Sequence, residues 1–500
     1  MDYYLGIDAG TSGLKVVAID AHGAMRGTGS ASYRLSTPRP GWAEADPHDW
    51  WTALCAATRQ LLVTAKIDAA QIVAVSFSGQ MHTLVLLDAQ FVPVRPAISW
   101  ADTRGSNERK EIEGRIGRAC LIEITGSPAV TAFTATKILW VRRHEPEVWQ
   151  RARVAMLCKD YVRWRLTGTV ATDPTDAGAT GLLDVRAREW AQPVLDALDI
   201  PHALLPPIAP STARAGHVSP TSASETGLRA GTIVGIGAGD QECAALGCGV
   251  IDSGPLLMTL GTGGQVFAAT TTPVIDPLGR VHALPHALAD RWHMLAAIPA
   301  AGLALEWAGR VLATPREQGE QLSAEPPIFV PDVAGARTPS MDEQARGAFV
   351  GLALDHTARD LSFAVREGVA FALRACVETL GALGVPSDPL LVTGGLSMDE
   401  DFLPLLADVL NRPLQRARHP EGSGYGAALL AASAAGHPLP SPAVAGAGLW
   451  YRPRADHAVW HARRYAAFRG TRQHSAHNMS NRDILHETRG NGPVLLEENT

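Results

Sequence analysis

The segment YLGIDAGTSGLKVVAID (Tyr4–Asp20) contains two apolar runs separated by a polar turn, which predicts a hairpin. A plain hairpin connection needs only two residues, whereas here Asp8 ends the first strand and Gly10–Gly13 follow. Glycines let backbone N–H groups approach an anion closely, and Thr11 and Ser12 add hydroxyl donors. The aspartate would repel a phosphate unless Mg²⁺ lay between them. The segment therefore predicts a turn that holds nucleotide phosphates, with Asp8 acting through a metal ion.

A second stretch past the middle of the chain has the same plan. PLLMTLGTGGQVFAAT (Pro255–Thr270) again contains an apolar strand, a Gly-Thr-Gly-Gly turn and an apolar strand. The first turn is not a P-loop, and it is not a Rossmann fingerprint because a strand follows it rather than a helix. We favour two copies of one phosphate-binding device, in duplicated domains that face each other across a cleft. Two unrelated hairpins are the alternative, because glycine-rich turns are common.

The bulk properties are those of a two-domain globular protein. The chain has 500 residues, too many for one core, and 46% of them are apolar. Its net charge of −6 argues against a nucleic-acid surface, and its six cysteines, without a C-x-x-C pair, predict reduced thiols. The start MDYYLGIDAG lacks the basic region of a signal peptide, and the longest apolar run, Met294–Leu305, is too short to span a bilayer. We therefore expect a cytoplasmic protein with no nucleic-acid or membrane partner.

Helix and strand patterns alternate along the chain, as in a mixed sheet covered by helices. Asp46 is the expected cap of a helix over residues 47–66, and Ile72–Gln80 reads as a buried strand. Residues 83–100 look like another hairpin, and Leu361–Leu383 has the apolar spacing of a long packed helix.

Two further glycine-rich turns follow in the second half. The strand Leu390–Thr393 meets Gly394 and Gly395 before a helix, and EGSGYGAALLAASAAG (421–436) leads into an alanine-rich helix. The last residues, His474–Thr500, are polar and lack periodicity. We predict a loose tail there, without an assigned function.

One aspartate stands at the start of a predicted helix, in GIGAGDQECAALGCG (Gly235–Gly249). A helix N-terminus stabilises the ionised carboxylate of Asp240, and the glycines before it leave it accessible. Such a carboxylate suits a base that accepts a proton from a substrate hydroxyl. A simple helix N-cap is the alternative.

With these features, the chain resembles the FGGY carbohydrate kinases over about Tyr3–Gly436. The matching segments are YLGIDAGTSGLKVV, PGWAEADPHDWW, SFSGQMHTLVLLD, RPAISWADTR, KILWVRRHEPEVW, KDYVRWRLTG, DPTDAGATGLLDV, GAGDQECAALGCG, LGTGG, RTP, GGLS and GYGAALLA. The resemblance implies an α/β fold of two RNase H-like (actin-like ATPase) domains facing a central cleft. We expect an N-terminal domain at 1–245 with the sugar site and the first phosphate hairpin, a nucleotide-binding domain at 246–440, and an extension at 441–500.

The resemblance also implies roles for individual residues, with ATP and Mg²⁺ as cofactors. Asp240 is the catalytic base, and the implied sugar-side residues are Met81, His82, Trp100, Asp102, Arg104 and Gln241. The implied nucleotide-binding residues are Asp8, Thr11, Ser12, Lys15, Gly261, Thr262, Gly394 and Gly395, with Asp8 holding Mg²⁺ through water.

Structural alternatives exist for several of these residues. Backbone hydrogen bonding would explain His82, core packing would explain Met81 and Trp100, a strand edge would explain Lys15, and a plain turn would explain Thr262. The chain also departs from the family pattern at four positions: Gly263 replaces the serine of Gly-Thr-Ser-Gly, Ala336 replaces the acid of GERTP, and Leu396 and Ser397 replace small residues.

The GQMH segment is similar to that of family members that phosphorylate D-xylulose to D-xylulose 5-phosphate, so this reaction is the implied activity. A kinase of another ketose or polyol, such as ribulose, fuculose or a sugar alcohol, is the first alternative. A non-catalytic sugar or nucleotide sensor is the second, because Gly263 and Ala336 depart from the pattern. The implied partners are a small ketose and ATP, and the oligomeric state stays open, with a homodimer as one alternative.

Overall fold

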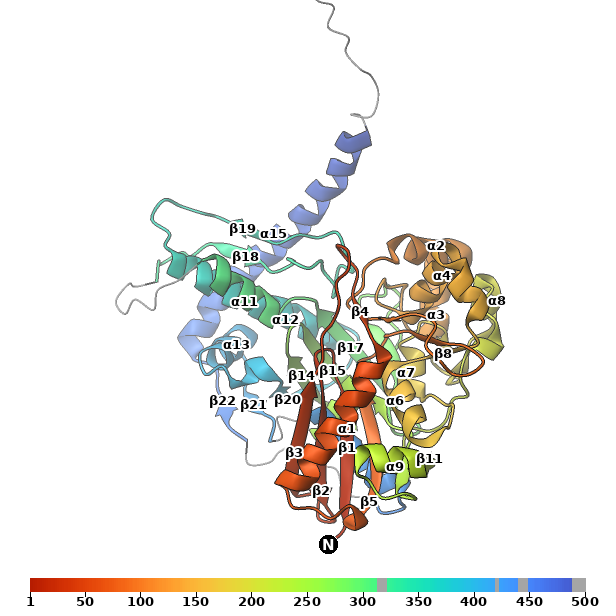
Figure 1. The fold of residues 1–500 in the computed structure, drawn as a ribbon. Coiled ribbons are helices and arrows are strands. Elements are labelled where there is room, and N and C mark those ends of the chain that lie inside the picture. The colour runs from red at the N-terminus through yellow and green to blue at the C-terminus, as the bar shows by residue number, and fades with distance from the viewer. Residues whose placement is uncertain (313–321, 419–421, 439–447, 488–500) are drawn as a thin grey trace, which may run out of the picture.

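The computed structural model of the chain describes residues 1–312, 322–418, 422–438 and 448–487, with side chains described up to 472. Two mixed sheets form the centre of the molecule (Figure 1). The first has the order β11 (Arg214–His217), β12 (Ile233–Gly235), β5 (Ile72–Gly79), β1 (Tyr3–Ala9), β2 (Gly13–Asp20), β3 (Met25–Ser32), with β13 (Ala238–Gly239) beside β5. The second has the order β16 (His282–Pro285), β17 (Trp292–Ile298), β15 (Gly264–Thr270), β14 (Gly254–Leu260), β20 (Ser387–Thr393), β21 (Leu414–Arg416), β22 (Trp450–Tyr451).

The two sheets share one topology. In the first, β3, β2 and β1 run antiparallel in turn, and β5 and β12 then follow parallel to β1. In the second, β17, β15 and β14 are antiparallel, and β20 and β21 follow parallel to β14. The matched strand directions support the predicted duplication, because unrelated hairpins would not bring the same three partners with them.

Each sheet has its own apolar core, built where the predicted periodicities place apolar faces. Helix α1 (Pro47–Thr64) packs on the first sheet, and its cap Asp46 accepts a hydrogen bond from the His48 amide at 2.9 Å, as predicted. Helices α12 (Ala358–Ala382) and α13 (Phe402–Leu410) pack on the second sheet. The long helix expected at 361–383 is therefore confirmed.

Helix α14 (Gly422–Ala434) lies late in the chain but packs on the first sheet. Its Tyr425, Ala428 and Leu429 share a buried cluster with residues of β1, β2 and β5. The contact is close: a Cβ at Gly6 would lie 1.8 Å from the Gly424 carbonyl oxygen. The second face of the N-terminal sheet is thus covered by a helix from the other end of the sequence.

A lobe of helices extends the first half, to the upper right in Figure 1. It includes α2 (Ser106–Ile116), α3 (Arg118–Thr125), α4 (Thr134–His144) and α8 (Gln192–Leu198), around a separate apolar core. The hairpin predicted for residues 83–100 is confirmed in part: antiparallel bridges join Leu84 to Ile98 and Leu87 to Pro93, but the regular ladders of its strands are made with other segments. The observed pairs are β6 (Val85–Leu87) with β8 (Val154–Met156), and β7 (Ala97–Ile98) with β4 (Glu44–Ala45).

The C-terminal segment differs from the predicted loose tail. Strand β22 joins the second sheet, and α15 (Ala455–Glu487) begins by packing Tyr465 and Phe468 into its core. The helix continues through residues 474–487, where no regular structure was predicted, while 488–500 lie outside the described residues. Within the described part, none of the helices is both long and apolar enough to cross a membrane.

Candidate active site

The first turn presents two unused amides. The N–H of Gly10 donates to the carbonyl at the far end of the turn, at 3.0 Å. The carbonyl oxygen of Gly10 accepts from the Tyr33 hydroxyl and, at 3.0 Å, from Nε2 of Gln80. Among the described residues, the amides of Thr11 and Ser12 have no acceptor. They are therefore available to an anion, as the sequence predicts.

The second turn repeats this plan with other supports. The Gly261 N–H donates to the Gly263 carbonyl at 2.9 Å, and the Thr262 and Gly263 amides find no acceptor in the described part of the chain. The carbonyls of Gly261 and Thr262 accept from three amides at the start of α11 (Gly302–Val311), namely those of Ala301, Gly302 and Leu303, at 2.9–3.1 Å. This turn is thus fixed by a helix N-terminus rather than by side chains.

The glycine at position 263 has a steric reason. A Cβ there would lie 2.9 Å from the Ile298 carbonyl oxygen and 3.2 Å from that of Pro299. A serine at this position would therefore require the backbone to move. The departure from the family pattern removes a hydroxyl but preserves the amides of the turn.

Asp240 is the first residue of α10 (Asp240–Gly247), and the N-cap is Gly239, without a side-chain cap. The alternative in which Asp240 merely caps the helix is therefore wrong. Burial and the nearby negative charge of Asp8 raise the pKa of Asp240 to about 7. Asp8 in turn accepts a hydrogen bond from the Ser78 hydroxyl at 2.8 Å. Two carboxylates near enough to influence each other's charge form an oxygen donor set that fits a divalent cation such as Mg²⁺.

A buried charge network, which sequence reasoning missed, supports the Asp240 segment. The Gly239 amide donates to the Thr175 hydroxyl at 2.8 Å, and that hydroxyl donates to Asp173 at 2.6 Å. The Lys159 ammonium lies 2.7–3.0 Å from three carboxylates, those of Asp160, Asp173 and Asp176. All four side chains of this ion-pair cluster are fully buried, so the strand end before Asp240 is firmly positioned.

Gln241 stands beside the proposed base. Its side chain and backbone lower the pKa of Asp240 against the effect of burial. Its Oε1 is buried and has no hydrogen-bond partner in the described structure. A buried acceptor of this kind calls for a donor such as a substrate hydroxyl.

His82 is held as a neutral imidazole. Its Nδ1 lies 2.6 Å from the Ala179 carbonyl oxygen, and because a carbonyl only accepts, Nδ1 carries the proton. Burial and the charge of Lys137 lower the pKa of His82 well below its usual value. The ring stacks on Phe133, with centroids 4.9 Å apart. Nε2 is therefore an acceptor for a hydroxyl proton.

The backbone around His82 explains why Lys137 is buried. His82 has a φ of +67°, and its carbonyl accepts from the Lys137 ammonium at 2.7 Å. Burial lowers the pKa of Lys137 to about 7. Met81 is 6% exposed, and its sulfur would lie 2.9 Å from a Cβ at Gly239, so it packs against the segment that carries Asp240.

Trp100 connects the predicted sugar side with the first turn. Its indole N–H donates to the Thr11 hydroxyl at 2.8 Å. This bond links two residues 89 positions apart, and sequence reasoning assigned them separately to sugar and nucleotide.

The structure brings Asp102 and Arg104 together, and they form an ion pair with each other. The Arg104 guanidinium pairs with Asp102 and Glu44, both at 2.7 Å, and lies 3.6 Å from the centroid of the Trp42 ring. The Arg104 side chain is 1% exposed. This buried ion pair supports the segment that carries Trp100. Direct contact of either residue with a sugar stays a prediction.

Arg337, the first residue of the RTP motif, is a candidate that sequence reasoning missed. Its charge lowers the pKa of His82, Lys137 and His282, so it faces all three. The guanidinium forms no hydrogen bond or ion pair within the described ranges. A buried cation from the C-terminal half, with Glu343 as its nearby acid, thus lies beside the predicted sugar residues. Ala336 before it is 1% exposed, so an acid at that position would be buried.

The remaining nucleotide-side residues shape the backbone. Gly394 has a φ of +91°, and a Cβ there would lie 2.5 Å from the Leu260 carbonyl oxygen. Gly395 opens a short 3₁₀ turn, and the Ser397 hydroxyl donates back to the Gly394 carbonyl at 2.6 Å. Lys15 stands opposite Asp8 in the β1–β2 ladder.

Comparison with known proteins agrees with this geometry. Residues 3–247 match the N-terminal domain, and residues 256–435 the C-terminal domain, of the FGGY family of carbohydrate kinases. The xylulose kinase of Escherichia coli K12 is 35% identical over 441 residues, covering 86% of this chain and 90% of that protein.

Two solved structures are similar over nearly the whole chain. A xyloylose kinase from Brucella ovis is 33% identical with a TM-score of 0.86, covering 94% of this chain and 98% of that one. A gluconate kinase from Lactobacillus acidophilus is 27% identical with the same TM-score, 0.86, and the same two coverages. The predicted pair of actin-like domains is confirmed, and the chain belongs to the FGGY family of carbohydrate kinases.

Proposed function

We propose that this kinase transfers the γ-phosphoryl group of ATP to D-xylulose and forms D-xylulose 5-phosphate. The observation that carries the proposal is Asp240, whose pKa is raised to about 7 beside Asp8. A general base works best when its pKa lies near the operating pH. The similarity to xylulose kinases supports the choice of the sugar.

The residues around Asp240 would divide the work of binding. The terminal hydroxyl of the sugar donates its proton to Asp240, while Gln241 Oε1 and His82 Nε2 accept from other hydroxyls. The four unused amides of the two turns hold the phosphates in line with that hydroxyl. Mg²⁺, held by Asp8 through water, would offset the charge of the phosphates.

This assignment divides the chain as the sequence suggests. Residues 1–245 would bind the sugar and contribute the first turn, and residues 246–440 would bind the nucleotide, with Gly394 and Gly395 on the adenine side. We propose a cytoplasmic enzyme, and a homodimer is the oligomeric state to test by sedimentation.

A sugar acid such as gluconate is the second candidate substrate. The guanidinium of Arg337, which makes no hydrogen bond or ion pair with a described residue, favours it, because arginine pairs with carboxylates in a two-pronged geometry. The gluconate kinase of equal TM-score supports the same candidate.

The test is ADP release with Mg·ATP across D-xylulose, ribulose, fuculose, sugar alcohols and gluconate. Strong stimulation by D-xylulose alone would support the proposal. A better response to gluconate, lost in Arg337→Gln, would move the substrate to the acids. The absence of any sugar-dependent ADP release would overturn both candidates.

A further inference from the structure

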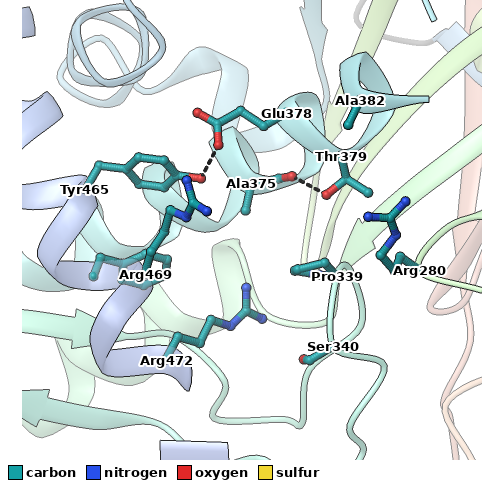
Figure 2. A pocket seen from close by; sticks show the side chains of 11 residues that line it. Arg280, Pro339, Ser340, Ala375, Glu378, Thr379, Ala382, Tyr465, Arg469 and Arg472 are labelled. Carbon is teal, nitrogen blue, oxygen red and sulfur yellow. Dashed lines mark hydrogen bonds between the residues drawn. The ribbon is translucent and has the colours of Figure 1, made fainter. Parts of the chain in front are cut away.

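A cavity of about 690 Å³ lies between α12, α15 and the loop that follows Arg337 (Figure 2). Ala375, Ala382, Pro339 and Phe468 contribute its apolar walls. A volume in this range accommodates an organic molecule of moderate size. None of these residues takes part in the proposed phosphoryl transfer.

Two arginines of the cavity are held in the same way. Arg280 pairs with Asp276 through Nε at 2.9 Å and one terminal nitrogen at 3.0 Å. Arg472 pairs with Asp332 through Nε at 3.0 Å and one terminal nitrogen at 2.9 Å. Each salt bridge uses one edge of the guanidinium. The other terminal nitrogen of Arg280 has no partner among the described residues, and that of Arg472 makes only a 3.5 Å contact with the Thr338 carbonyl oxygen.

A third arginine, Arg469, completes the positive side. Its guanidinium makes no hydrogen bond or ion pair with any described residue, and its charge lowers the pKa of Tyr465 against the effect of burial. Figure 2 shows the three guanidinium groups around one space. Glu378 is the acid of the lining, but it already accepts from Arg374 at 2.9 Å and from the Tyr465 hydroxyl at 2.8 Å. The cavity therefore offers donors for an anion and no uncommitted acid to repel it.

We propose that this cavity binds an anionic organic molecule, a phosphate or carboxylate that carries an apolar group. The charged part contacts Arg280, Arg469 and Arg472, and the apolar part lies against the alanines and Phe468. Both halves are needed, because exposed arginines alone bind anions weakly in water.

The site has a short connection to the predicted sugar side. Thr338 lies between the cavity residue Pro339 and Arg337, whose charge faces His82. The Thr338 amide donates to the Ala297 carbonyl at 3.0 Å, and its hydroxyl donates to the Arg280 carbonyl at 2.9 Å. A ligand that fixes Arg280 and Arg472 therefore also fixes the loop that positions Arg337, and we expect it to change the KM for the sugar.

The test is calorimetric titration of the full chain with phenyl phosphate, while saturating Mg·ADP occupies the nucleotide site. Inorganic phosphate and phenol, which each carry half of the probe, should bind at least tenfold more weakly. Arg469→Gln should weaken phenyl phosphate at least tenfold. The matched control is Arg463→Gln, on the same helix but paired with Glu325 outside the cavity, and it should bind like the parent.

A second variant tests the cavity without removing a positive charge. Ala382→Trp should reduce the cavity volume and weaken the probe while leaving the Mg·ADP affinity unchanged. The proposal is overturned if Arg469→Gln binds the probe normally or if excess ADP displaces it. It is also overturned if a second copy of the chain covers the cavity, shown by a dimer whose dissociation depends on Arg469.

Discussion

The two phosphate turns have the same backbone but different supports. In both, the first glycine closes the turn and two amides stay unused in the described structure. The first turn is held mainly by the side chains of Tyr33 and Gln80, with one backbone bond from the Tyr33 amide to the Ser12 carbonyl at 3.1 Å, and its Thr11 hydroxyl accepts from Trp100. The second turn is held by backbone amides at the start of α11. Duplication thus explains the strand order and the amides, whereas the supports differ.

The difference suggests separate tasks for the two turns. Gln80 and Trp100 belong to the segments that carry Met81 and the predicted sugar side, so a sugar bound there can change the first turn. The second turn is fixed by a helix, and among the described residues no side chain of the predicted sugar side hydrogen-bonds to it. We therefore expect perturbations of the first turn to affect sugar and ATP together, and perturbations of the second to affect ATP alone.

The largest effect is expected at Asp240, the proposed base, toward which both turns hold the phosphates. Asp240→Asn removes the base, so turnover should fall by about three orders of magnitude or more. ATP affinity should stay near that of the parent, because the amides of both turns are intact. Single-turnover transfer and equilibrium nucleotide binding measure the two quantities. Substantial remaining turnover would show that the base is another group.

The pH profile should show the same group in the unmodified chain. Asp240 must be ionised to accept a proton, and its pKa is about 7 in the free protein. kcat/KM should therefore fall about tenfold per pH unit on the acid side, at or below that value, because Mg²⁺ beside Asp8 lowers the pKa of Asp240. Initial rates at subsaturating sugar, between pH 5 and 8, test this. A flat profile across that range would contradict the assignment.

Gly263→Ser tests the second turn alone. The added side chain would approach the Ile298 carbonyl oxygen to 2.9 Å, so the turn should shift and the KM for ATP should rise about tenfold. The KM for the sugar should stay within twofold. Gly309→Ala, on helix α11 and outside the turn, is the control, because a Cβ there meets nothing within 4 Å. A serine that improved ATP binding would show that the family hydroxyl outweighs the clash.

Trp100→Phe tests the first turn through its connection. The change removes the hydrogen bond to Thr11 and keeps the aromatic ring, so it should cost about 1 kcal/mol, or about fivefold in kcat/KM. KM values for the sugar and for ATP should both rise. If only one of them changes, the two ligands are not coupled through this bond.

The smallest effect concerns stability. The pKa of Asp240 is near 4 in the unfolded chain and about 7 in the folded protein. Because the folded state favours the protonated carboxyl, the free energy of unfolding decreases as the pH rises from about 4 to about 7. Asp240→Asn should therefore raise the Tm by a few degrees, about 2–4 °C, at pH 8 and leave it unchanged at pH 4. Calorimetry without nucleotide measures both. An equal shift at both pH values would indicate packing rather than charge.

Local sequence patterns predicted local structure, whereas features that depend on residues far apart in the sequence were not predictable. The α1 cap and the two turns depend on neighbouring residues, so they were predictable. The hairpin at 83–100 was predicted only in part, because its strands also pair with β4 and β8, which no local pattern identifies. The role of Thr175 depends on its hydrogen bond with Gly239, 64 positions away, and that of Arg337 on the charge that it presents to the distant His82. Sequence periodicity carries no information about such pairs.

The packing of α14 on the first sheet has a consequence for synthesis. A ribosome completes β1, β5 and α10 long before it reaches residue 422, so the N-terminal sheet leaves the exit tunnel with Tyr4, Val17 and Ile19 uncovered. Exposed apolar strands in a nascent chain favour aggregation and chaperone binding. The N-terminal half therefore completes its folding only after the last quarter of the chain has been synthesised. We expect it to aggregate when it is expressed as a separate fragment.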